Sequence, residues 1–153
     1  MGARTKFQVV PAAYIVMRRG EQVLLQLRTN TGYMDDHWAM AAAGHVEADE
    51  SVYAAAVREA GEELGVVIDV ADLTPLCAMH RTQGNHQWID ERVDFFFSCT
   101  RWSGVPRLLE TGKAADLEWF GLDALPNPVV PHELAVLQRL LDRDLQPVIT
   151  FGF

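Results

Sequence analysis

The densest group of carboxylates in the chain lies between residues 44 and 66. Glu59, Glu62 and Glu63 are spaced i, i+3 and i+4, so an α-helix would place them on one arc of its surface. Like charges at these spacings each destabilise a helix by about 0.2 to 0.5 kcal/mol, which Arg58, four residues before Glu62, relieves only in part. A hard divalent cation such as Mg²⁺ prefers oxygen ligands and bridges to phosphate groups, so these carboxylates suit metal-dependent chemistry on a phosphorylated compound.

The helix that must carry these glutamates has a signal at each end. Asp49 is the predicted N-cap, Glu50 favours the positive end of the helix dipole, and Gly65 suits the left-handed C′ position. We therefore expect a helix over residues 50–64. Its predicted sheet-facing arc consists of Tyr53, Ala56, Val57, Ala60 and Leu64.

A glutamate-rich helix seen alone is more often a solvated acidic face than a metal site. Here the whole segment resembles the Nudix box, G-x5-E-x7-R-E-U-x-E-E-x-G-U with U aliphatic, and fills its positions from residue 44 to residue 66, with Ala60 the loosest fit. The resemblance implies an α/β fold of the Nudix type, an α/β/α sandwich with a mixed central sheet. It also implies a metal-dependent hydrolase that cleaves a phosphoanhydride bond in a nucleoside diphosphate-linked compound.

The resemblance also implies roles for individual residues of the box. The carbonyl of Gly44 and the carboxylates of Glu59, Glu62 and Glu63 would bind the metal, and Arg58 would orient these carboxylates. Mg²⁺ is the expected ion and Mn²⁺ the alternative, since both accept oxygen ligands. Phosphoryl transfer depends chiefly on positioning and on neutralising charge around phosphorus, which agrees with such a site.

Three residues outside the box are further candidates. Glu110 lies in a region similar to a loop that carries the catalytic base in MutT-like members, so we expect it to assist the attacking water; a solvent-exposed loop acid is the alternative. Arg28 resembles a phosphate-contacting arginine of MutT-like members. Arg81 lies at a hairpin expected to border the substrate pocket. For both arginines a surface or structural role is the alternative.

Apolar runs and turn residues predict the elements around the central helix. Predicted strands cover residues 7–17, 22–28, 38–41, 76–81, 88–99 and 117–120, and a second amphipathic helix covers residues 134–141 after a linker rich in proline. The sequence contains no internal repeat or low-complexity tract. We therefore expect one domain over residues 1–153.

Composition narrows the partners and the compartment. A formal net charge of −8 argues against binding to nucleic acid or to an anionic membrane, because either needs a basic patch. No apolar run reaches the ~20 residues of a membrane span. Cys77 and Cys99 are expected to be reduced core thiols of a cytoplasmic protein. The oligomeric state stays open, with a homodimer as one alternative.

The expected partner is a small-molecule nucleotide, and a nucleoside triphosphate is the first choice because the chain has a compact, MutT-like layout. Nucleotide sugars and dinucleotides are alternatives. A non-catalytic nucleotide-sensing domain is a further alternative, although such domains commonly lose box glutamates that this chain keeps. MutT-like members often read the base with Asn or Asp before the last helix, where this chain has His132 and Glu133, so no base preference is predicted.

Overall fold

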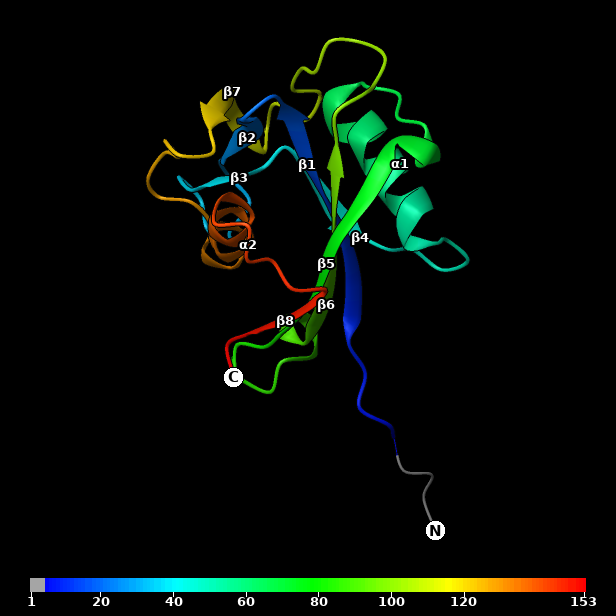
Figure 1. Ribbon diagram of the computed structural model, residues 1–153. Helices are drawn as coiled ribbons and strands as arrows, with labels where there is room; N and C mark the ends of the chain where they lie inside the picture. The colour runs from blue at the N-terminus through cyan, green and yellow to red at the C-terminus, as the bar shows by residue number, and fades with distance from the viewer. Residues whose placement is uncertain (1–4) are drawn as a thin grey trace.

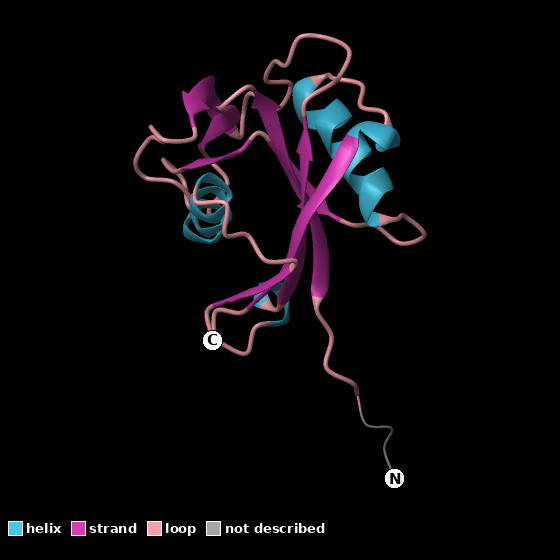
Figure 2. Ribbon diagram, in the orientation of Figure 1, coloured by secondary structure: helices cyan, strands magenta, loops and turns pink. Residues whose placement is uncertain are grey.

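A mixed β-sheet with one α-helix on each face forms the framework of residues 5–153, the part of the chain described by the computed structural model (Figure 1). Figure 2 shows the strands in magenta and the helices in cyan, in the same orientation. The strands are β1 (Val10–Arg19), β2 (Gln22–Arg28), β3 (Trp38–Met40), β4 (Ala42–His45), β5 (Leu73–Arg81), β6 (Arg92–Cys99), β7 (Ala114–Gly121) and β8 (Val148–Phe151). The helices are α1 (Val52–Leu64) and α2 (Pro131–Leu141), and short 3₁₀ turns lie at Val70–Asp72 and Trp88–Asp90. The expected α/β fold with a mixed central sheet is confirmed.

Strand pairing brings segments from both halves of the chain to the centre of the sheet. The order is β3-β2-β1-β6-β5-β8, with β4 paired to β1 and β7 paired to β2. β1 runs parallel to β6 and β5 runs parallel to β8, whereas the other pairs are antiparallel. β4 pairs with β1 from Ala42 opposite Ile15 to His45 opposite Ala12. It therefore leads from the middle of the sheet into the loop before α1.

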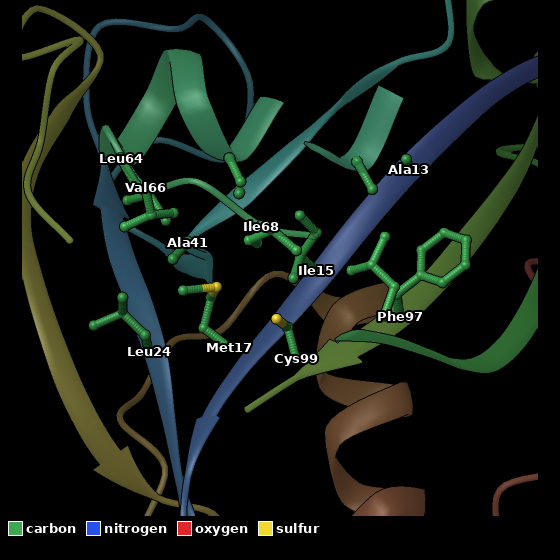
Figure 3. Close-up of a cluster of buried hydrophobic side chains, with 14 of the residues drawn as sticks. Ala13, Ile15, Met17, Leu24, Ala41, Leu64, Val66, Ile68, Phe97 and Cys99 are labelled. Carbon is green, nitrogen blue, oxygen red and sulfur yellow. The ribbon is translucent and has the colours of Figure 1, made fainter. Parts of the chain in front are cut away.

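The hydrophobic core has two halves, and alternate residues of β1 contribute to each, as expected for a strand buried on both faces. The half beneath α1, shown in Figure 3, contains Ala13, Ile15, Met17, Phe97, Ala55, Ala56, Ala60 and Leu64. The half beneath α2 contains Ala12, Tyr14, Val16, Phe96, Val136 and Leu137. Because three of the buried residues of α1 are alanines, its backbone can lie close to the sheet.

The start of α1 differs from the expectation based on the sequence. Ser51, and not Asp49, is the N-cap, because its Oγ accepts a hydrogen bond from a first-turn amide at 3.0 Å. Asp49 has a φ of 63°, a left-handed conformation that belongs to the turn before the helix. Glu50 also precedes the helix, and its carboxylate pairs with Arg58 instead of acting at the helix dipole. Gly65 is confirmed at the C-terminus of α1, with a φ of 69°.

Other boundaries were also predicted wrongly. β6 begins at Arg92, because Trp88–Asp90 forms a 3₁₀ turn before it. α2 begins at Pro131 instead of residue 134, since a proline fits the first helical turn, where its missing N–H has no partner to lose. β8 was not predicted, because a four-residue edge strand carries little periodic signal.

Both cysteines are free and buried, as expected. Burial raises the pKa of the Cys77 thiol to about 11 and also raises the pKa of Cys99, so both thiols stay protonated at neutral pH. Within residues 5–153, no helix has the length and apolar character needed to cross a lipid bilayer.

Candidate functional site

Arg58 connects the carboxylates around α1 with the end of β4. Its Nε and Nη2 donate to the two carboxylate oxygens of Glu50 at 2.7 and 2.9 Å, which forms a bidentate pair. Its Nη1 donates to Glu59 at 2.8 Å and to Glu62 at 3.2 Å, and Nη2 also donates to the carbonyl of His45 at 3.1 Å. The hydrogen bonds from Arg58 lower the pKa of Glu50 to about 2. One guanidinium therefore holds three carboxylates in place.

Glu59 lies directly against the backbone of Gly44. A Cβ atom added at Gly44 would lie 2.7 Å from Oε2 of Glu59 and closer still to Oε1, so a side chain at position 44 would displace this carboxylate. The Glu59 side chain is 13 % exposed. Its burial raises the pKa of the carboxyl group, and the hydrogen bond from Arg58 opposes this shift.

Glu63 is the most deeply placed glutamate of α1. Its Oε2 accepts a hydrogen bond from the amide of Ala43 on β4 at 2.8 Å. Burial, followed by repulsion from Glu59 and Glu110, raises the pKa of Glu63 to about 8 against the opposing effect of the Ala43 amide. Two half-buried acids thus face the same space from consecutive turns of one helix.

Glu110 reaches this region because its loop is anchored at both ends. The amides of Arg107 and Leu109 donate to the carbonyls of Leu64 and Glu63 at 3.1 Å each, which caps the C-terminus of α1. The other end of the loop is anchored by the amide of residue 29, next to the end of β2, which donates to the carbonyl of residue 113 at 3.0 Å. Glu110 therefore lies between the carboxylate helix and the end of β2.

Two adjoining cavities form a cleft beside these residues. The outer chamber, of about 550 Å³, is lined by Glu59, Glu63, Glu110, Arg28, Lys113 and Thr31, among others. The inner chamber, of about 430 Å³, is lined by Tyr14, Arg81, Arg92, His132, Glu133 and Gly44, among others. Both chambers share Gln26, Arg28, Ala43, His45 and Glu63 on their walls. Their volumes fall in the range of small-molecule sites, about 300 to 1,000 Å³.

The inner chamber contains polar groups for which the sequence analysis predicted no role. Oε1 of Glu133 accepts a hydrogen bond from the amide of Met40 at 2.7 Å, and burial raises the pKa of this carboxyl group to about 7. Nε2 of His132 lies 3.2 Å from the hydroxyl of Tyr14. Burial, together with nearby arginines, lowers the pKa of His132 to about 2, so this imidazole is neutral.

A charged group on β5 and β6 lies next to His132, whose Nε2 is 3.9 Å from Oδ2 of Asp94. Nε of Arg81 donates to Oδ2 of Asp94, and Nη2 of Arg81 donates to the hydroxyl of Tyr14 at 3.4 Å. Asp94 has no exposed surface, and Arg81 is 6 % exposed. The sequence could have indicated Arg92 and Asp94, because two charged residues two positions apart in a predicted strand share one face.

The structure brings most of the predicted site residues to one cleft. Glu59, Glu63 and Glu110 line the outer chamber with Arg28, and Gly44 and Arg81 line the inner one. Nε and Nη2 of Arg28 donate to the carbonyl of Tyr33 and the hydroxyl of Thr31, at 2.9 and 3.0 Å, which ties this guanidinium to the loop after β2. Glu62 and Arg58 are the exceptions, because neither lines either chamber. The Glu62 side chain is 55 % exposed and turned toward Arg58.

The donor set suits a hard divalent cation. The site offers carboxylate oxygens on adjacent turns of a rigid helix, and burial and mutual repulsion raise the pKa values of Glu59 and Glu63. A bound cation would relieve both effects. Among residues 5–153, no three His, Cys, Asp or Glu side chains are already gathered around one point, since Glu62 is held by Arg58 and Glu63 by Ala43. Cation binding would therefore involve rotation of these side chains.

The comparisons with known proteins agree with the fold and the box. The NUDIX domain model matches residues 8–140. The chain is 31 % identical over 135 residues to the NAD-capped RNA hydrolase NudC of Pseudomonas aeruginosa, an alignment that covers 86 % of this chain and 42 % of the relative. The chain thus spans less than half the length of that relative.

Two solved structures extend the comparison. The MutT NUDIX hydrolase from Burkholderia pseudomallei superposes with a TM-score of 0.77 at 28 % identity, covering 87 % of this chain and 98 % of that one. A NUDIX hydrolase from Nitrosomonas europaea shares the fold with a TM-score of 0.72 at 18 % identity, covering 95 % and 81 %.

The fold and the box are those of the Nudix class of proteins. The chain belongs to the Nudix family. Enzymes of this family generally depend on a divalent metal and act on small nucleotide substrates.

Proposed function

We propose that this enzyme cleaves a phosphoanhydride bond in a nucleoside diphosphate-linked compound, with a nucleoside triphosphate as the first candidate substrate. The observation that carries the proposal is the pair of half-buried carboxylates, Glu59 and Glu63, that line a cleft together with Glu110 and Arg28. Acidic groups with raised pKa values in a cleft are typical of functional sites, because their burial is otherwise unfavourable. The MutT description of the relative from Burkholderia pseudomallei supports the same reading.

In this proposal the carboxylates of Glu59, Glu62 and Glu63 and the carbonyl of Gly44 hold Mg²⁺, or alternatively Mn²⁺. When bound, the ion supplies positive charge for the phosphate oxygens and lowers the pKa of a bound water. Arg58 does not line the cleft, but its hydrogen bonds orient Glu59 and Glu62. It is therefore a positioning residue.

The remaining candidates act on the water and on the substrate. Glu110 accepts a proton from the attacking water, for which its place opposite Glu59 and Glu63 is suitable. Arg28 and Arg81 donate hydrogen bonds to phosphate or other acceptor atoms of the substrate, since both line the inner chamber. A single ligand can contact both arginines and the carboxylate helix, because Glu63 also lines that chamber.

Dinucleotides are the second candidate substrates. The support is the 31 % identity to a relative described as an NAD-capped RNA hydrolase, which covers 86 % of this chain. A cleft of two adjoining chambers also offers a place for a group on each side of an anhydride.

The test is a panel of purified compounds assayed with Mg²⁺ and, separately, with Mn²⁺. The panel contains the common nucleoside triphosphates, ADP-ribose, a nucleotide sugar and NADH, and the readout is release of phosphate, pyrophosphate and nucleoside monophosphate. We expect metal-dependent release from at least one compound, lost on chelation. The matched variant is Glu63→Gln, which keeps an oxygen to accept the Ala43 hydrogen bond and removes the charge. Tight nucleotide binding without hydrolysis of any compound would instead indicate a sensing domain.

A further inference from the structure

Two arginines lie directly opposite each other on neighbouring strands of the inner chamber. Arg81 of β5 and Arg92 of β6 are paired in the antiparallel register, and both line the chamber. Like charges in this arrangement are destabilising unless a negative charge lies between them. Asp94 lies two residues after Arg92 on the same face and is the hydrogen-bond partner of Arg81.

Asp94 does not satisfy both arginines. Its Oδ1 lies 3.8 Å from Nε of Arg92, a distance that allows attraction but is too long for a hydrogen bond. Both atoms are buried and have no hydrogen-bond partner among residues 5–153. Buried polar groups are normally hydrogen-bonded, so these atoms indicate a missing partner.

The charges around the pair leave an excess of positive charge. Two guanidinium groups face one buried carboxylate, and Arg28 lines the same chamber. His132 is neutral because burial and the nearby arginines lower the pKa of its imidazole. Asp90 also lines the chamber and reduces this excess by one charge, but its carboxylate oxygens accept hydrogen bonds from Gln83 and Asn85, at 3.2 and 2.8 Å, and within residues 5–153 it forms no ion pair with either arginine.

Apart from Glu63, which belongs to the carboxylate helix, Glu133 is the remaining acid of this chamber that could balance the charge. One of its carboxylate oxygens is occupied by the amide of Met40. Its burial favours the protonated form, so at neutral pH it supplies only part of a negative charge. The inner chamber of a chain with a net charge of −8 is therefore locally positive.

We propose that Arg81 and Arg92 form an anion subsite that binds a phosphate monoester carried by the substrate away from the anhydride that is cleaved. The proposal rests on the proposed function for the position of the cleaved bond. A guanidinium presents planar donors that match phosphate oxygens, and two of them on adjacent strands can share one phosphate. A neutral acceptor such as a base carbonyl could accept hydrogen bonds from the two guanidinium groups but would leave their positive charge unbalanced.

The subsite and the carboxylate helix are close enough to serve one substrate. Glu63, Gly44 and the arginine pair line the same chamber of about 430 Å³. Substrates that fit this arrangement are nucleoside diphosphate derivatives with an additional phosphate monoester on a sugar.

The first experiment measures binding without catalysis. Inorganic phosphate is titrated into the metal-free protein, with a chelator present, and followed by calorimetry. We expect Arg92→Gln to weaken binding by about tenfold or more, as a charge-assisted hydrogen bond is worth about 1.5 to 3 kcal/mol. Arg101→Gln, which removes the same charge from an exposed position outside the cleft, should leave binding unchanged. Equal binding by wild type and Arg92→Gln, or no binding by either, would overturn the subsite.

The second experiment separates substrate-borne phosphate from free phosphate. NADPH is compared with NADH, and coenzyme A with dephospho-coenzyme A, because each pair differs by one phosphate monoester. We expect kcat/KM to be about tenfold higher for the phosphorylated member of at least one pair, and Arg92→Gln to remove this preference. Hydrolysis without any preference would contradict the substrate-borne phosphate. Arg92-dependent phosphate binding with no hydrolysis of the four compounds or the earlier panel would contradict the proposed function and leave the subsite supported.

A second variant, which keeps the charge, is used if the first one does not fold. Thermal unfolding is measured for every variant. If Arg92→Gln does not fold, Arg92→Lys replaces it in both experiments, because lysine retains the charge but lacks the planar donor pair. We expect its phosphate affinity to fall by about threefold to tenfold. Unchanged affinity in a folded Arg92→Lys protein would count against a subsite built on two guanidinium groups.

Discussion

Gly44 and Glu59 are in such close contact that no side chain fits at position 44 without moving the carboxylate. Gly44 belongs to β4, and Glu59 belongs to α1, so the contact fixes the distance between the carboxylate helix and the sheet. The hydrogen bond from Arg58 holds Glu59 from the other side. The glycine at the first position of the box is thus required by space and not by an unusual backbone angle.

Gly44→Ala is therefore expected to reduce kcat/KM by about 100-fold, since misplacement of a reacting group by about 1 Å costs this much. The fold should survive, because the flexible Glu59 side chain can rotate away. The control is Gly61→Ala on α1, where the nearest atom to an added Cβ is the carbonyl oxygen of Val66 at 3.7 Å. This control should keep full activity and raise the free energy of unfolding by about 0.5 to 1 kcal/mol, since alanine is the better helix former. Steady-state kinetics and chemical denaturation measure both.

Arg58→Lys is expected to separate positioning from substrate binding. A lysine cannot form the bidentate pair with Glu50 while also donating to Glu59 and Glu62. We expect kcat to fall by about 10- to 100-fold and the Mg²⁺ concentration for half-maximal activity to rise, with the KM for nucleotide nearly unchanged. Arg101→Lys at an exposed position is the control. A loss confined to thermal stability, with normal metal dependence, would show that Arg58 is purely structural.

Glu110→Gln tests the proposed proton acceptor. If Glu110 takes a proton from the attacking water, kcat should fall by about 100-fold or more, while KM changes little. Asp142→Asn, an exposed acid at the end of α2, removes the same charge far from the cleft and should be neutral. Wild-type turnover by Glu110→Gln on the best substrate would rule out this role.

Glu133 should give the protein a measurable pH dependence of stability. Its pKa is raised from 4.5 to about 7 by burial, so folding favours the protonated form. The unfolding free energy of wild type relative to Glu133→Gln should fall as pH rises from about 4.5 to about 7, and stay constant above that. The full difference is on the order of 3 kcal/mol.

The comparison with Glu133→Gln is needed because His132 changes the unfolding free energy with pH in the opposite direction. Its pKa is lowered to about 2, so its contribution to stability is lost as pH falls below 6.5. Glutamine keeps an oxygen for the Met40 amide, and His132 is present in both proteins. Urea denaturation between pH 4 and pH 8 measures the difference. Parallel stability curves for the two proteins would contradict a raised pKa at Glu133.

The spacing of its glutamates predicted the carboxylate helix from the sequence alone, and the resemblance to the Nudix box indicated the reaction class that we propose. Glutamates at i, i+3 and i+4 must share one arc of a helix, and this follows from 3.6 residues per turn without any knowledge of the remaining fold. The same local periodicity located most strands and the C-terminal glycine of α1. Errors occurred where several local signals compete, as at Asp49, Glu50 and Ser51, which are all suitable near a helix N-terminus.

Which residues meet in the inner chamber follows only from the tertiary structure. Met40 meets Glu133 across 93 residues, and Tyr14 meets His132 across 118, so no local pattern relates either pair. The opposition of Arg81 and Arg92 depends on the register of β5 and β6, and a slip of one residue would turn one of the two side chains to the other face of the sheet. Short-range periodicity sets which face of an element a residue occupies, whereas packing between elements sets which residues from different faces come together.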